Sequence, residues 1–399
     1  MAALALMLML ATSTGFSGCA PKAPENSGRL TIALAIFPSE AVKYRAFLRD
    51  FETGNHVRVA LIAQSYSDIL RALLAEGSAA KGSLDLVELD LSMLARARGS
   101  VQPLDTTVSP EAEALFPEAA WNAARFDGHL FFIPHRLMWQ AMIYNRLRVP
   151  NPPATWDQLL DFARRHPGKV VLKGARYEGA TCDMLSFLWS AGGNPLEPES
   201  PANLCAFEFL ADLAPYLNPE SAVYREMSVL EAQARGSVWI HFNWPFALGY
   251  LESKGLAPSV DLSAPIPSGP VGTATVLGGG YLAIPRSAPH PKLAAKLIRY
   301  LLTRDAQTRL SRELGWYGSV GPPAGSEQAK LYAGFIAMRP YVRARPTIDC
   351  YGQLSNAWQR GFRAVLFRNV APQAALGQVA SMTRFEKSSE QGARPCPCP

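Results

Sequence analysis

Two short segments place aromatic rings where a small polar molecule could come close: Asn243-Trp244-Pro245-Phe246 and Gly278-Gly279-Gly280-Tyr281. A polyhydroxy ligand needs flat rings over its C–H faces and polar partners for its hydroxyl groups, since a buried polar group without a partner costs about 1–3 kcal/mol. We predict that Trp244 stacks on such a ligand, with a core position as the alternative. We also predict ligand contacts at Gly279, Gly280 and Tyr281, because glycine lets other groups approach the backbone closely.

Two carboxylates follow predicted strands. Glu40 comes just after Pro38-Ser39, behind the first strand, and Asp90 ends the third. The carboxyl ends of parallel strands face the ligand cleft in open α/β folds, so we predict that both side chains accept hydrogen bonds from ligand hydroxyl groups. The alternative is a carboxylate in the first turn of a helix, where the helix dipole favours negative charge.

Residue patterns typical of enzymes are missing from the sequence. The six histidines show no HxxxH or HExxH spacing, no Gly-x-Ser-x-Gly segment is present, and the three consecutive glycines lack dinucleotide-binding spacing. We therefore expect no catalytic residues, no metal site and no cofactor. An enzyme on a two-lobed scaffold stays open as an alternative, because catalytic groups can assemble from distant positions.

Strand and helix patterns alternate near the N-terminus, which predicts a parallel sheet with right-handed crossovers. The predicted elements are a strand at 30–37, a helix at 40–53, a strand at 57–63, a helix at 67–76 and a strand at 84–90.

Further along the chain, we predict strands at 128–134 and 139–145, separated by His135-Arg136-Leu137-Met138. Thr155 is a strong helix start signal for a helix at 156–165. The remaining predictions are helices at 184–191, 206–214, 293–302, 354–367 and 371–383, and strands at 237–242 and 275–285.

The composition indicates a folded protein with more than one core. The chain has 399 residues, of which 48% are hydrophobic, and a formal net charge of +6. The basic residues are scattered and accompany no nucleic-acid-binding motif, so we do not expect nucleic acid as a partner. Cys182 and Cys205 could form a disulfide in an oxidising compartment, since both are predicted to open helices in the same region.

Several segments resemble, in order and spacing, the family 1 extracellular solute-binding proteins of ABC importers. Residues 127–134 followed by 142–145 resemble the family's "dG-x-lyaiP … lyYN" pattern, and 152–159 resemble its "P-x-TWdel" helix start. Residues 84–90 and 279–285 look like two further strands of the family. The match runs from residue 29 to about residue 385.

Within this family, the sequence resembles the branch that binds trehalose, maltose and related sugars. Tyr177-Glu178-Gly179, 242–246 and Arg345-Pro346-Thr347 match segments of that branch, although Phe246 stands where a Tyr is usual. The resemblance implies that Arg345 is a cleft arginine that donates hydrogen bonds, with an exposed arginine as the alternative. Phe246 and Trp139 complete the predicted ligand-binding residues.

The resemblance also implies the fold class, α/β, with the two-lobed type II periplasmic-binding-protein fold typical of maltose-binding proteins. We expect an N-terminal lobe at 29–135 and 276–320, and a C-terminal lobe at 136–275 and 321–388. Hinge crossings are expected near 134–137, 274–277 and 318–322, with the ligand in the cleft between the lobes.

The N-terminus is similar to a bacterial lipoprotein signal. An apolar run at 2–11 precedes Thr14-Gly15-Phe16-Ser17-Gly18-Cys19, and the run is too short to span a bilayer. We expect a signal peptide at 1–18, a lipid on Cys19, a flexible tether at 19–28 and a disordered tail at 389–399. A buried apolar N-terminal helix is the alternative.

The resemblance therefore implies an extracytoplasmic, lipid-anchored sugar-binding subunit that delivers a di- or oligosaccharide to membrane permease subunits. We expect it to be a monomer held at the cell membrane, on its periplasmic or outer face. A protein of the same fold that binds a glycerophosphodiester or a polyamine remains an alternative.

Overall fold

The first lobe is built on the predicted strand–helix alternation. In the computed structural model, which describes residues 28–76, 82–255 and 261–383, β1 pairs in parallel with both β2 and β3. The apolar residues that give the first helix its spacing are buried at Tyr44, Phe47, Leu48 and Phe51, whereas Val42 is 65% exposed. The elements are β1 (Gly28–Leu34), α1 (Pro38–Asn55), β2 (Val57–Ala63), α2 (Tyr66–Glu76) and β3 (Leu86–Asp90). The parallel unit is therefore confirmed.

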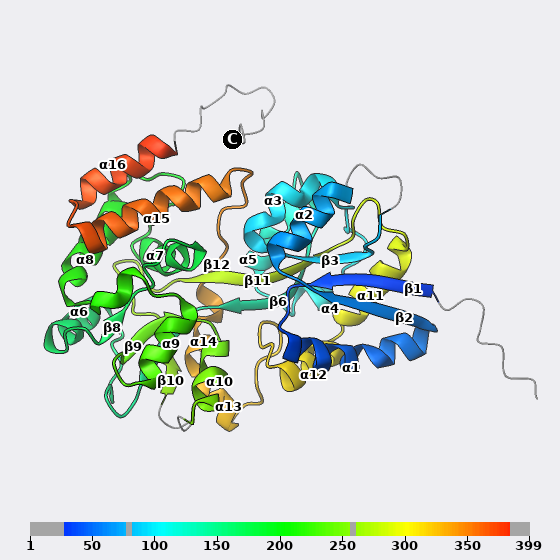
Figure 1. Cartoon of the computed structure of the whole chain (residues 1–399), viewed down its shortest axis with the longest axis horizontal. Coiled ribbons are helices and arrows are strands. Elements are labelled where there is room, and N and C mark those ends of the chain that lie inside the picture. Colours follow the sequence, from blue (N-terminus) through cyan, green and yellow to red (C-terminus); the bar gives the residue numbers. More distant parts are fainter. Residues whose placement is uncertain (1–27, 77–81, 256–260, 384–399) are drawn as a thin grey trace, which may run out of the picture.

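Shorter elements and two later helices complete this lobe, on the right in Figure 1. They are η1 (Leu91–Met93), α3 (Leu94–Ala97), η2 (Arg98–Ser100), α4 (Pro110–Glu113), α5 (Glu118–Ala123), β4 (Arg125–Phe126), β5 (His129–Leu130), α11 (Pro291–Leu301) and α12 (Arg304–Leu314). The signal peptide, Cys19, residues 19–27 of the predicted tether and the C-terminal tail lie outside the described residues, while Gly28, the last residue of that tether, begins β1.

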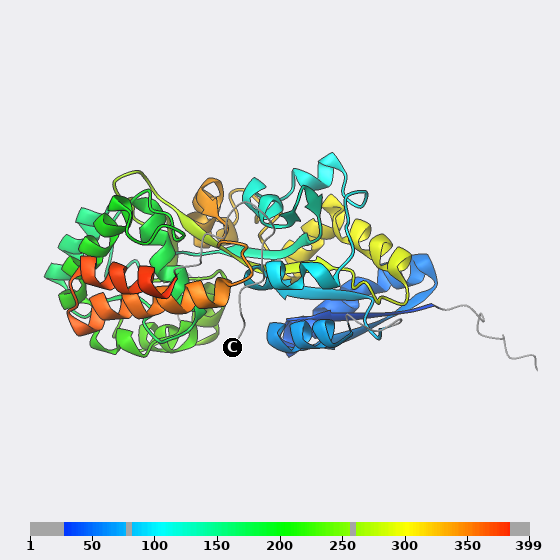
Figure 2. The same cartoon turned by 90° about the horizontal axis from the view of Figure 1, so that it is seen from above.

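Two antiparallel strands, β6 (Ile133–Trp139) and β11 (Thr275–Ala283), run between the lobes (Figures 1 and 2). β11 also pairs with β3 and with β12 (Val342–Arg343), so the sheet order is β12-β11-β3-β1-β2 with β6 beside β11. The predicted break between two strands at residues 135–138 is wrong. Pairing with β11 extends from Ile133 to Trp139 and holds this segment in one strand.

The glycines of β11 are approached closely, but by protein atoms. A Cβ on Gly279, whose φ is +113°, would lie 2.0 Å from the Arg136 carbonyl oxygen. A Cβ on Gly280 would lie 2.1 Å from a carboxylate oxygen of Glu88. The absence of side chains at these two positions lets β6 and β3 pack closely against β11.

The second lobe contains a four-stranded sheet of order β10-β7-β9-β8. The predicted helix α6 (Trp156–Arg165) has its predicted bounds, because the Thr155 side chain accepts a hydrogen bond of 3.3 Å from the Gln158 backbone N–H. The strands are β7 (Ala141–Asn145), β8 (Val170–Val171), β9 (Ile240–Asn243) and β10 (Asp261–Ala264). The helices are α7 (Glu178–Ser190), α8 (Pro201–Leu213), η3 (Ala214–Tyr216), η4 (Pro219–Ala222), α9 (Glu226–Ala234), α10 (Phe246–Ser253), α13 (Glu327–Leu331), α14 (Ala333–Met338), η5 (Arg339–Tyr341), α15 (Tyr351–Arg368) and α16 (Pro372–Met382).

Cys182 and Cys205 are both free thiols, so the disulfide considered from the sequence is not formed. Both residues lie inside helices, α7 and α8, and not at the helix starts where the sequence pattern places them. The thiol of Cys182 is enclosed in the core, and burial raises its pKa. Sequence spacing shows neither the orientation nor the depth of the two side chains.

The core of the second lobe holds charged groups. Lys173 and Asp183 are fully buried and paired, and the Lys173 ammonium also donates to the Phe242 carbonyl. His241 lies beside them on β9, fully buried. Burial, together with the nearby positive charge of Lys173, lowers the pKa of His241 to about 3. The histidine is therefore neutral in the folded protein at neutral pH.

Because His241 is buried in its neutral form, we predict that the stability of the folded protein decreases in acid. Unfolding returns the pKa of His241 to about 6.5, so between pH 6.5 and 3 the unfolded chain binds the proton more tightly. The free energy of unfolding must fall as the pH drops through that window. The wild type loses free energy of unfolding between pH 7 and pH 4, and we expect His241→Leu to make this loss smaller by about 2–3 kcal/mol. Urea unfolding at each pH measures it. The exposed His56, replaced by Asn, is the control; an equal effect there would contradict the assignment.

Candidate functional site

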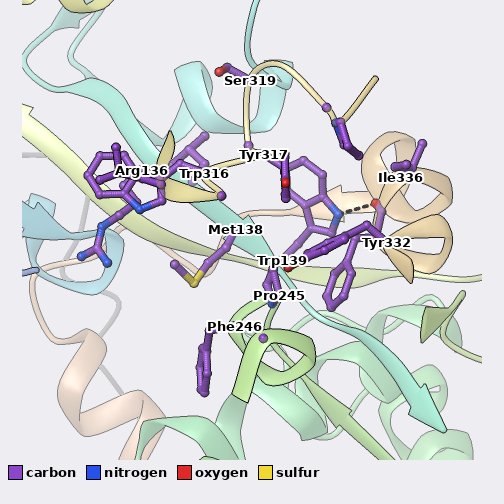
Figure 3. Close-up of a pocket in the computed structure, with 18 of the residues that line it drawn as sticks. Arg136, Met138, Trp139, Pro245, Phe246, Trp316, Tyr317, Ser319, Tyr332 and Ile336 are labelled. Carbon is purple, nitrogen blue, oxygen red and sulfur yellow. Dashed lines mark hydrogen bonds between the residues drawn. The ribbon is translucent and has the colours of Figure 1, made fainter. Parts of the chain in front are cut away.

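A cavity of about 520 Å³ lies between the two lobes and is lined mainly by aromatic and apolar side chains (Figure 3). We call it the aromatic cavity. Its first-lobe wall comes from the start of α1, with Phe37, and from the segment after α12, with Trp316. Its second-lobe wall comes from Phe246 at the start of α10 and from Phe335 on α14. The aromatic cavity is therefore shaped by parts of the chain that are far apart in sequence.

Glu40 has the helix-start role considered from the sequence, and it also lines the aromatic cavity. One of its carboxylate oxygens accepts a hydrogen bond of 2.9 Å from the Phe37 backbone N–H and caps the start of α1. The other accepts one of 3.0 Å from Trp316 Nε1. Arg136 Nη1 lies 3.7 Å from the same side chain. Glu40 is thus held at the wall of the aromatic cavity by the helix, an indole and a guanidinium group.

Trp316 is positioned by the end of α12. Gly315 ends that helix with φ of +73°, a left-handed conformation that glycine adopts readily, and turns the chain toward the aromatic cavity. The indole then packs against Tyr44 and His135, with ring centres 5.4 and 5.3 Å away. The Arg136 guanidinium lies over it at 5.4 Å. These contacts leave Trp316 little freedom to move.

A buried charged network lies behind this wall. Glu88 is fully buried and accepts hydrogen bonds from the Ala35 backbone N–H and from His135, each at 2.9 Å. Burial favours the neutral acid, but the positive charge of Arg136 and these hydrogen bonds lower the pKa of Glu88 to about 2. Arg136 in turn stays protonated, because Glu88, Tyr66 and Glu40 raise its pKa against the effect of burial. The wall therefore presents a fixed cation, Arg136.

The opposite wall is also rigid. Trp139 Nε1 donates a hydrogen bond of 2.6 Å to the Phe335 carbonyl, drawn as a dashed line in Figure 3. The ring of Tyr332 in this wall meets edge to face the ring of Tyr317 from the segment after α12, with centres 4.8 Å apart. Phe246 differs from these residues, because 38% of its surface is exposed. It is the ring in this wall most available to a ligand.

A second feature connects the lobes, and we call it the arginine bridge. Arg345, which lies between β12 and α15, donates to Asp90 at 2.9 and 3.1 Å and to Glu178 at 2.9 Å. Asp90 ends β3 in the first lobe, whereas Glu178 begins α7 in the second lobe. Tyr351 and Ser355 also donate to Glu178. Arg345 is 3% exposed and forms ion pairs with both carboxylates.

The structure divides the predicted site residues into three groups. Glu40, Trp139 and Phe246 line the aromatic cavity. Asp90 and Arg345 contact each other in the arginine bridge, so the alternative of an exposed Arg345 is wrong. Gly279, Gly280, Tyr281 and Trp244 do not line the aromatic cavity.

The prediction for Tyr281 is wrong, whereas Trp244 lies outside the lining of the aromatic cavity and its stacking role stays a prediction. Tyr281 is fully buried and its hydroxyl donates to the Ala120 carbonyl at 3.3 Å, so it is a core residue of the first lobe. Trp244 is half-buried and packs on Gly278, where an added Cβ would lie 2.7 Å from the indole. Gly278 thus makes room for Trp244, while Gly279 and Gly280 make room for the Arg136 carbonyl and for Glu88.

Sequence reasoning missed Phe37 and Arg136, and it placed Trp316 only among weaker candidates for ligand contact. Phe37 offered one signal, because it directly precedes Pro38 at the carboxyl end of the first strand. The sequence contained no signal for Arg136, since the segment around it was predicted to connect two strands. Its position depends on pairing with β11, more than a hundred residues away.

Two α/β lobes with a ligand-sized cavity between them define a binding protein of the hinged, two-lobed class. Sequence comparison gives the same answer. The family profile described as bacterial extracellular solute-binding protein matches residues 46–337. A probable ABC transporter-binding protein from Deinococcus radiodurans is 26% identical over 368 residues, covering 82% of this chain and 87% of that protein. A maltotriose-binding protein from Pyrococcus abyssi is 23% identical, covering 80% and 68%.

Solved structures show the same fold. An ABC transporter solute-binding protein from Thermotoga lettingae, bound with α-D-tagatose, superposes with a TM-score of 0.73 at 24% identity, covering 90% of this chain and 99% of that one. A cyclic α-maltosyl-1,6-maltose binding protein from Arthrobacter globiformis gives 0.78 at 18% identity, covering 90% and 98%.

The chain belongs to the bacterial extracellular solute-binding proteins, which collect solutes for ABC transporters and are not enzymes. Among the described residues, no helix is long and apolar enough to cross a membrane.

Proposed function

We propose that this protein binds a di- or oligosaccharide of the trehalose or maltose type in the aromatic cavity and delivers it to the permease of an ABC importer. The observation that carries the proposal is the placement of aromatic rings on both walls of one interlobe cavity, with Glu40 and Arg136 beside them. Rings can cover the C–H faces of a sugar, while a carboxylate and a guanidinium group serve its hydroxyl groups.

The size of the aromatic cavity and the ligands of similar proteins support this choice. A volume of about 520 Å³ falls within the usual range of small-molecule sites, about 300–1,000 Å³. A sequence relative is a maltotriose-binding protein, and two proteins of the same fold are a cyclic α-maltosyl-1,6-maltose binding protein and a solute-binding protein bound with α-D-tagatose.

The charges in the aromatic cavity favour a neutral solute over the two charged alternatives. Glu40 is the single acidic side chain among its described lining residues, and it already pairs with Trp316 and Arg136, so a polyamine would lack counter-charges. A phosphodiester would compete with Glu40 and Glu88 for Arg136. A second arginine, Arg339, is committed to the carbonyls of Gly318, Ser319 and Leu115.

A thermal-shift screen of the mature protein tests the proposal. A solute that binds only the folded state raises the melting temperature, by an amount that grows with its concentration relative to Kd. We expect a disaccharide or oligosaccharide at about 1 mM to raise the melting temperature by several degrees, and spermidine and glycerophosphocholine to have no effect. A shift with a charged metabolite and with none of the sugars would reject the sugar assignment.

We further propose that the lobes comprise residues 29–135 with 276–320 and residues 136–275 with 321–388, and that they close by bending where β6 and β11 cross between them. The crossing strands support this division, since each contributes to both sides of the molecule (Figure 2).

Attachment to the membrane through Cys19 remains a proposal from the sequence pattern alone. Lipid-precursor labelling of the wild type against Cys19→Ser tests it.

A further inference from the structure

A hollow of about 440 Å³ on the second lobe is lined by four arginines, and we call it the arginine hollow. Arg360, Arg363 and Arg368 come from one side of α15, since their spacing places them within about 140° around the helix axis. Arg176, in the segment before α7, completes the group, while Gln378, Ser381 and Met382 of α16 form the facing wall. The arginine hollow does not share a lining residue with the aromatic cavity.

The charge in the arginine hollow is not balanced. Among the described residues no carboxylate lines it, and none forms an ion pair with any of its four arginines. Elsewhere on the protein, Arg98, Arg125 and Arg309 each pair with an acid. Like charges on neighbouring positions of a helix, such as Arg360 and Arg363, repel each other and destabilise the helix. The protein therefore tolerates a repulsive cluster at this place.

Two of the guanidinium groups are held in position. Arg363 donates to the Gly174 carbonyl and, at 2.7 Å, to the Ala222 carbonyl. Arg176 donates to Asn356 Oδ1 at 2.9 Å. Burial, and then the positive charges of Arg368 and Arg176, lower the pKa of Arg363. The three guanidinium groups therefore repel one another. Attraction to the negative end of the α15 dipole accounts for Arg368 in the last turn, but not for Arg360 or Arg176.

We propose that the arginine hollow binds the phosphate group of a phosphate ester. Guanidinium groups match phosphate oxygens with paired hydrogen bonds, and a charge of about −1.5 to −2 would relieve the repulsion among four cations. The hollow is larger than a phosphate ion alone needs, so it has room for the organic part of an ester. The ester can be a free metabolite or the headgroup of an anionic lipid, and the two sources are separable by experiment.

The test compares the wild type with Arg360→Gln/Arg368→Gln, a variant that removes two exposed charges from the arginine hollow. The matched control is Arg49→Gln/Arg58→Gln, which removes two exposed arginines from the first lobe and changes the net charge equally. Binding of glycerol 3-phosphate is measured by calorimetry in low salt. Binding to phosphatidylglycerol and phosphatidylcholine vesicles is measured by co-sedimentation. Circular dichroism verifies the fold of both variants.

We expect the variant of the arginine hollow to bind at least fivefold more weakly than the wild type in one of the two assays, with the control unchanged. Loss with glycerol 3-phosphate assigns a soluble ester, and loss with phosphatidylglycerol vesicles alone assigns a lipid headgroup. Equal binding by wild type and variant in both assays overturns the proposal, as does an equal loss in the control, which would mean that net charge alone drives binding. Sugar-induced thermal shifts are expected to be the same in all three proteins, which separates this inference from the proposed function.

Discussion

Arg345→Met is expected to lower the free energy of unfolding by about 3–5 kcal/mol, the usual effect of removing one partner from a buried ion pair. The substitution leaves Asp90 and Glu178 facing each other without the guanidinium group between them. Because these acids belong to different lobes, the loss acts on the contact between the lobes as well as on local stability. Urea unfolding, followed by circular dichroism, measures it.

Two further variants sharpen this prediction. Arg343→Met changes an exposed arginine two residues away, and we expect it to lower the free energy of unfolding by less than about 0.5 kcal/mol. The triple variant Arg345→Met/Asp90→Asn/Glu178→Gln removes the unpaired charges, and we expect it to regain most of the lost stability. If Arg345→Met proved as mild as Arg343→Met, the arginine bridge would have no stabilising role.

Phe246→Ala is expected to weaken sugar binding by about tenfold or more, which corresponds to roughly 1.4 kcal/mol. The ring of Phe246 lines the aromatic cavity and is 38% exposed, so its removal takes away a stacking surface with little loss of core packing. Phe37, on the opposite wall, is 64% exposed, and Phe37→Ala is expected to have a similar effect. Calorimetry with the sugar that gives the largest thermal shift measures both.

The control is Val223→Ala, which trims another exposed apolar residue of the second lobe outside the aromatic cavity. We expect its sugar affinity to equal that of the wild type. Unchanged affinity in both phenylalanine variants, combined with a large loss in Trp244→Ala, would move the binding site away from the aromatic cavity and toward the position indicated by the sequence.

Local signals predicted local structure well. Thr155 marked the start of α6 because an N-cap acts on backbone groups within three residues. The alternation of the first three strands with two helices predicted a parallel unit, since each helix buries a continuous apolar face. In both cases the physical cause lies within a few residues of its effect.

The site was harder to predict, because its residues depend on distant partners. The resemblance implied a ligand-binding role for Arg345, but no local signal showed that it pairs with carboxylates more than 160 residues away. Tyr281 is a residue type that suits a sugar site, but it is buried in the core, where its hydroxyl donates to the Ala120 carbonyl. Aromatic residues suit both cores and binding sites, so composition and spacing alone cannot separate the two.

The strand order has a consequence for how the chain reaches its fold. β11 lies directly beside β3, yet about 185 residues separate the end of β3 from the start of β11. At about 5–20 residues per second of synthesis, the sheet of the first lobe waits roughly 10 to 40 s for this strand. Until then, β3 has one unpaired edge and the first lobe is incomplete. Folding must therefore come late, when most of the chain is available, and the nascent chain needs protection from aggregation during that interval.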